Sequence, residues 1–68
     1  MKLGEAMKKL REMHVIEEKL LDMLIDEQAN YCIDDVKAIT SKIFEVVAII
    51  NQLTNLIIEC KKRGDKRL

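Results

Sequence analysis

A heptad pattern of apolar residues runs from Val36 to Cys60 and constrains the fold more than any other feature of this chain. Every a and d position of four consecutive heptads is apolar, with Val36, Ile43, Ile50 and Ile57 at a, and Ile39, Val46, Leu53 and Cys60 at d. An α-helix presents such a 3-4 alternation as one continuous stripe along its surface. The pattern therefore predicts a long helix that buries this stripe against other helices.

A second apolar pattern occupies the first half of the chain, with spacings of three and four and one slip in register between Met13 and Ile16. It predicts a first helix over about residues 2–29, followed by a turn over about 30–34, because Asn30 tolerates the left-handed backbone that ends many helices. A break near Asp26 is the alternative, and it would shorten the first helix without removing the hairpin.

The second helix is expected over about residues 35–62, with a basic tail over 63–68. Asp34 is a candidate N-cap, and Asp35 suits the positive end of the helix dipole. Gly64 is expected to close the helix after the basic residues 61–63. Two helices of similar length with a short connection predict an all-α fold, a single antiparallel αα-hairpin domain over 1–68.

Composition supports helices and a reducing environment. The chain has 68 residues and no proline, and it is 49% apolar and 35% charged, which suits a helical bundle better than a sheet or a disordered tail. Cys32 and Cys60 on one helix would lie roughly 42 Å apart at the helical rise, which excludes a disulfide within one chain. Because the first residues lack the apolar segment of a signal peptide, we expect a cytoplasmic protein.

No membrane partner is expected. The most apolar stretch, Ile43 to Ile58, has 16 residues and carries Glu45 and three amide side chains, so it is short and polar for a bilayer span.

The apolar stripe of the second helix is too wide for one partner helix to cover. Apolar side chains also occupy flanking heptad positions, such as Val47 at e and Leu56 at g. Monomeric proteins rarely expose such a patch, so we expect a homodimer or tetramer, most simply two hairpins in a four-helix bundle. The predicted interface comprises Val36, Ile39, Ile43, Val46, Val47, Ile50, Leu53, Leu56 and Ile57. A different protein that supplies the missing helices is the alternative.

Charge is distributed along the predicted hairpin, although the formal net charge is zero. Nine basic residues fall at the end with both termini, and acidic residues gather around the turn. Two such rods would favour opposite orientations, which would also bring Cys32 of one chain toward Cys60 of the other. The basic end is also a candidate contact for RNA or DNA, through Lys8, Lys9, Arg11, Lys61, Lys62 and Arg63.

Little in the sequence indicates catalysis or metal binding. His14 is the one histidine, with Glu17 and Glu18 one turn away, and the Glu-x-x-His motif of di-iron bundles is missing. The sequence also lacks a glycine-rich loop and an evident pair of nucleophile and base. We therefore expect a non-enzymatic protein with no cofactor.

Two resemblances accompany these patterns. The segments MKLGEAMKKLREM (1–13) and VVAIINQLTNLI (46–57) resemble parts of the septicolysin-like family of small bacterial helical proteins, whose members are longer. The segment 26–29 followed by Cys32 resembles part of the second helix of Rop-like plasmid copy-number regulators. That resemblance implies a hairpin that dimerises and binds paired RNA loops, with Lys19 at an RNA-contacting position. Lys8 stands where those regulators have an aromatic residue.

Overall fold

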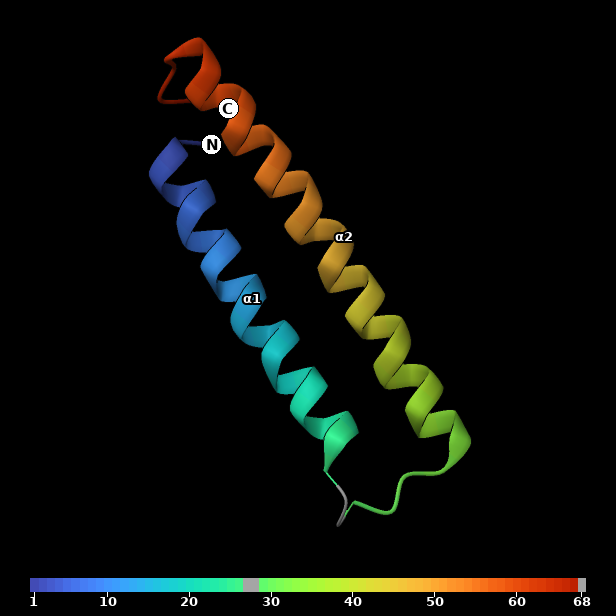
Figure 1. The fold of residues 1–68 in the computed structure, drawn as a ribbon. Coiled ribbons are helices and arrows are strands. Elements are labelled where there is room, and N and C mark those ends of the chain that lie inside the picture. The colour runs from blue at the N-terminus through green and yellow to red at the C-terminus, as the bar shows by residue number, and fades with distance from the viewer. Residues whose placement is uncertain (27–28, 68) are drawn as a thin grey trace.

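The chain forms two antiparallel helices joined by a short connection (Figure 1). The computed structural model describes residues 1–26 and 29–67, with α1 over Leu3–Ile25 and α2 over Ile33–Arg63. The only β pairing among the described residues is an isolated bridge between Lys2 and Arg67. The hairpin is a rod with Cα extents of 49 × 15 × 15 Å. The predicted all-α hairpin is confirmed.

The first helix ends earlier than the expected limit at residue 29. Asp26 has extended backbone angles, with φ −71° and ψ 104°, so α1 ends at Ile25, in agreement with the alternative break near Asp26. Residues 27–28 of the expected helix lie outside the described residues. The early end has an electrostatic reason. The last turn of α1 contains no basic residue to stabilise its negative dipole end, and the acidic Asp26 follows at once.

The second helix begins two residues before the expected position, and Asp34 is not its N-cap. Cys32 is the N-cap residue, and Asp35 reaches back to it. The Asp35 Oδ2 atom accepts hydrogen bonds from the Cys32 backbone N–H at 3.3 Å and from its thiol at 3.2 Å. Asp34 and Asp35 both lie in the first turn, where the helix dipole favours negative charge.

Gly64 ends α2, as the sequence predicts, and its φ of 75° is the only positive φ among the described residues. The Gly64 N–H donates to the Lys61 carbonyl at 3.2 Å, and the Asp65 N–H donates to the Cys60 carbonyl at 3.1 Å. These two bonds form a Schellman motif, which satisfies carbonyl groups at the end of the helix.

Gly64→Ala should destabilise the protein by about 1 kcal/mol, because a side chain disfavours the left-handed backbone. No described atom outside the immediate backbone lies within 4 Å of the position that a Cβ atom would occupy at Gly64 or at Gly4, so a clash contributes at neither site. Gly4→Ala is therefore a matched control, and it should be neutral or slightly stabilising because Gly4 is helical. Urea unfolding at equal protein concentrations would measure both effects, and equal losses at the two sites would contradict the prediction.

The core lies between the helices and is dominated by α2. Its buried residues are Ile39, Val46, Ile50, Leu53, Ile57 and Cys60 of α2, together with Ala6 of α1. All four d positions of the heptad pattern are therefore buried. Because α2 has 31 residues and α1 has 23, part of α2 has no α1 residue opposite it. Residues 33–38 are all exposed, which includes the a position Val36.

Candidate interaction surface

The predicted interface residues divide into three groups in the hairpin. Ile39, Val46, Ile50, Leu53 and Ile57 are buried in the core of the single chain. Ile43 and Val47 are half-buried, whereas Val36 and Leu56 are exposed. The heptad stripe therefore serves first to join α2 to α1, and the surface left for a partner lies beside it.

Several large apolar side chains outside the predicted interface are exposed. On α2 the most exposed are Ile33 and Phe44, at 72% and 70%. Sequence reasoning missed those of α1, which are Met7, Val15, Ile16, Leu21, Met23 and Ile25. Half of them, Val15, Leu21 and Ile25, are apolar residues outside the row that the spacing pattern assigns to the contact with the second helix, and this is the signal that could have found them.

One face of the hairpin carries a row of α2 residues without Asp, Glu, Lys or Arg. On α1 the same face carries apolar residues and His14, interrupted by the charged residues Arg11 and Glu18. Viewed along its own axis, each of these sets lies roughly 30–140° around the helix from the buried row, in the direction in which residue number increases. Because the two helices are antiparallel, a turn in this direction reaches the same side of the hairpin on both helices. We call this side the apolar face. Its members are Met7, Leu10, His14, Leu21 and Ile25 of α1, and Val36, Thr40, Ile43, Val47, Asn51, Thr54 and Ile58 of α2.

The two threonines of this face bond to their own helix. The Thr40 hydroxyl donates to the Val36 carbonyl at 2.8 Å, and the Thr54 hydroxyl donates to the Ile50 carbonyl at 2.7 Å. Each hydroxyl therefore has a partner that does not depend on solvent, which lowers the cost of covering the face with another protein surface.

On α2, the opposite face is interrupted by charge whereas the apolar face is not. Beside Ile49 and Leu56 it carries charged residues of both signs, and Lys42 Nζ pairs with Glu45 Oε2 there at 3.5 Å. Both side chains of this pair are exposed, so the pair contributes little to stability. The apolar face is therefore the better candidate for a protein partner.

A hollow of about 330 Å³ lies at one end of the apolar face. It is lined by Met7, Leu10, Arg11, His14 and Ile57. The His14 Nδ1 atom lies 3.6 Å from Glu17 Oε1, one turn along α1. No group of three or more His, Cys, Asp or Glu residues in 1–26 and 29–67 is arranged to hold a metal ion.

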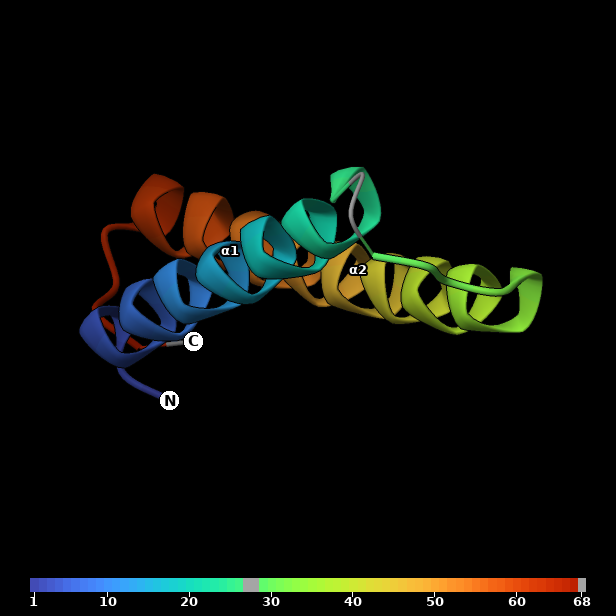
Figure 2. The ribbon, with the colours of Figure 1, turned by 90° about the horizontal axis from the view of Figure 1, so that it is seen from below.

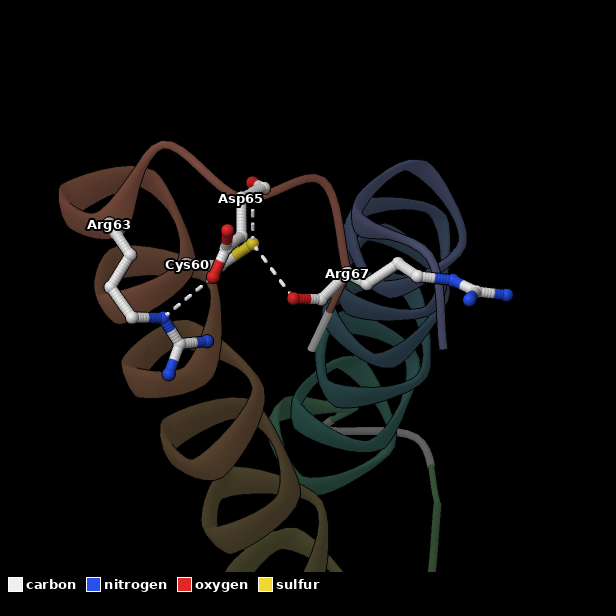
Figure 3. Close-up of polar contacts among 4 residues, drawn as sticks. All are labelled: Cys60, Arg63, Asp65 and Arg67. Carbon is white, nitrogen blue, oxygen red and sulfur yellow. Dashed lines mark hydrogen bonds and ion pairs between the residues drawn. The ribbon is translucent and has the colours of Figure 1, made fainter.

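The end of the rod with both termini is closed by a strap, which we define as residues 65–67. The Leu3 N–H donates to the Lys66 carbonyl at 2.8 Å, next to the bridge between Lys2 and Arg67. Figure 3 shows the buried Cys60 thiol donating to the carbonyls of Asp65 at 2.9 Å and Arg67 at 3.5 Å. Arg63 Nε also lies 3.2 Å from Asp65 Oδ2.

The strap places the basic tail beside the start of α1. Lys2, Lys66 and Arg67 are thereby brought together near the basic last turn of α2, residues 61–63. Lys8, Lys9 and Arg11 lie further along α1, within its first half, and all three are exposed. In Figure 2 the two termini and the strap lie at the same end of the rod, away from the connection.

By length and composition alone, α2 could cross a membrane. A window of 18 residues within it has a mean hydropathy of 1.5, and 28% of that window is buried inside the hairpin. Core helices of soluble proteins meet the same criterion.

Comparison of the chain with family models, curated proteins and solved structures gives no match.

Proposed function

We propose that this chain is a non-enzymatic association module whose hairpins pack together into a larger helical bundle. The observation that carries this proposal is the amount of apolar side chain that a single hairpin leaves exposed, with Ile25 at 73% and Phe44 at 70%. Contiguous exposed apolar patches typically mark interaction sites. A homodimer that forms a four-helix bundle is the simplest assembly, and a tetramer or a different helical protein are the alternatives. We expect the module to act in the cytoplasm without a membrane partner.

Sedimentation equilibrium of the full chain, in reducing buffer and over a wide concentration range, tests this function. We expect a stable multiple of the 7.9 kDa chain mass. A folded monomer at every concentration would contradict self-association and would direct attention to a different partner protein.

A second candidate function is RNA or DNA binding at the basic end. The observation that favours it is the strap, which collects basic residues from both ends of the chain at one end of the rod. Lysine and arginine side chains would contact phosphates there, and the affinity would fall steeply with salt.

Reversal of charge at Lys61, Lys62 and Arg63 to Glu should remove nucleic-acid binding, as measured by fluorescence anisotropy with a labelled RNA hairpin and a labelled DNA duplex at two salt concentrations. Changing Lys19, Lys37 and Lys42 to Glu is a matched control, because it alters the net charge equally but away from the basic end. Loss of binding in the control alone would place the contact at one or more of Lys19, Lys37 and Lys42 instead of at the basic end. No binding by the unaltered chain would exclude this candidate for the probes used.

A further inference from the structure

We propose that the apolar face is occupied by a second copy of this chain in antiparallel orientation, with α2 packed on the partner's α2 about a two-fold axis at Val47. This inference rests on the proposed function and adds to it the interface, the orientation and the register. Three independent features carry it, namely the order of residues along α2, the length of the helix and the distribution of charge.

The apolar face of α2 reads almost the same in both directions from Val47. Its members lie at positions 36, 40, 43, 47, 51, 54 and 58, so the spacings are 4, 3 and 4 on either side of the centre. In an antiparallel pair centred on Val47, Val36 would lie opposite the partner's Ile58, and Thr40 opposite the partner's Thr54. Both pairs match in chemistry, as a two-fold interface requires of a self-complementary surface.

The hydrogen bonds of the two threonines fit this pairing. Because Thr40 and Thr54 each donate to a carbonyl of their own helix, their hydroxyl groups need no partner across the interface. The one unequal pair is Ile43 with Asn51, and Asn51 is exposed in the hairpin. On a helical projection it lies at the outer edge of the row, where an amide can stay in contact with water.

The position of the axis also gives nearly the longest possible overlap of the two α2 helices. The helix α2 extends over Ile33–Arg63, so its middle residue is Ala48, next to Val47. A two-fold axis at Val47 therefore places the two α2 helices alongside each other over almost their full length. It also covers Val36, which α1 leaves exposed at the far end of the rod.

Charge selects the antiparallel orientation. In this register the acidic first turn of α2, with Asp34 and Asp35, lies beside the partner's basic last turn, residues 61–63. A parallel pair would instead bring like charges together at both ends. Each exposed pair contributes little and is screened by salt, but both ends favour the same orientation.

The apolar face can be tested against the opposite face with a matched pair of variants. Ile58→Lys alters the apolar face and Leu56→Lys alters the opposite face, at sites that are 46% and 45% exposed on the same helix. We expect Ile58→Lys to weaken the dimer at least tenfold by sedimentation equilibrium, and Leu56→Lys to leave it nearly unchanged. The reverse result would overturn the assignment of the face. Circular dichroism would confirm that both variants keep their helices.

Disulfide trapping tests the orientation and the register, in a Cys32→Ser background that removes the exposed native thiol. A chain with Val36→Cys is mixed with a chain with Ile58→Cys under mild oxidation, and the products are separated by mass. We expect the mixed Val36→Cys/Ile58→Cys dimer to dominate. Dominance of the two like dimers would indicate a parallel pair and overturn this inference, while the proposed self-association would stand. If the unaltered chain sediments as a monomer, the proposed function itself fails.

Discussion

Ile50→Asp should abolish the folded hairpin and, with it, any oligomer. Ile50 occupies an a position in the middle of α2 and is only 7% exposed. A carboxylate at this position would be buried without a partner, because the surrounding core residues are apolar. Burial of an uncompensated charge costs on the order of 3–5 kcal/mol, and the core of a chain of this size seldom contributes more than about 3–5 kcal/mol of net stability.

Far-ultraviolet circular dichroism is the direct measurement, since it would show the loss of helix at 25 °C. Gln52→Asp is the matched control, because it introduces the same residue two positions away at an exposed site. We expect the control to keep nearly all of its helical signal. Retention of both helicity and assembled mass by Ile50→Asp would contradict the assignment of Ile50 to the core.

The two thiols should differ in their reactivity toward a thiol reagent by on the order of 100-fold. Cys32 is exposed at the start of α2, whereas Cys60 has no exposed surface beneath the strap. Cys60 can react only after a local opening that releases residues 65–67 from the start of α1. An opening free energy of about 3 kcal/mol corresponds to on the order of 100-fold protection.

The Cys32→Ser variant isolates the reaction of Cys60, and Cys60→Ser isolates that of Cys32. We expect the slow reaction of Cys60 to become fast in denaturant, and also in a chain that ends at Gly64 and therefore lacks the strap. Equal rates for the two thiols in native buffer would show that the strap does not protect Cys60. The same burial argues against a ready crosslink from Cys60 to Cys32 of a partner chain, which the antiparallel arrangement of charges had suggested.

The boundaries of the helices show where reasoning from local sequence succeeds. The end of α2 follows from Gly64 and three basic residues, because the left-handed backbone and the dipole act over one turn of helix. The start of α2 was harder to predict. Asp34 was the expected cap, whereas the structure uses Cys32 together with Asp35, whose carboxylate accepts hydrogen bonds from both the backbone N–H and the thiol of Cys32. The end of α1 was predicted only as an alternative, since Asn30 offered a second plausible stop.

The candidate surface was less accessible to sequence reasoning. The heptad pattern identified the apolar side of α2 but could not distinguish residues that the single chain buries, such as Ile39 and Leu53, from residues that stay exposed, such as Val36 and Phe44. That distinction depends on the position of α1 across α2 and on the difference in their lengths. The strap was also missed, because a bond between Leu3 and Lys66 joins segments that are distant in the sequence.

The sequence by itself determined that this protein is a hairpin of two amphipathic helices with most of its basic residues at one end. Helical periodicity, helix-ending residues and charge order are local properties that need no knowledge of packing. Only the tertiary structure decided which apolar residues one chain can bury, how the strap covers Cys60, and which face remains uncovered. These features depend on the relative placement of the two helices. The shorter α1 cannot cover the whole apolar surface of α2, which is longer and carries a wider apolar stripe.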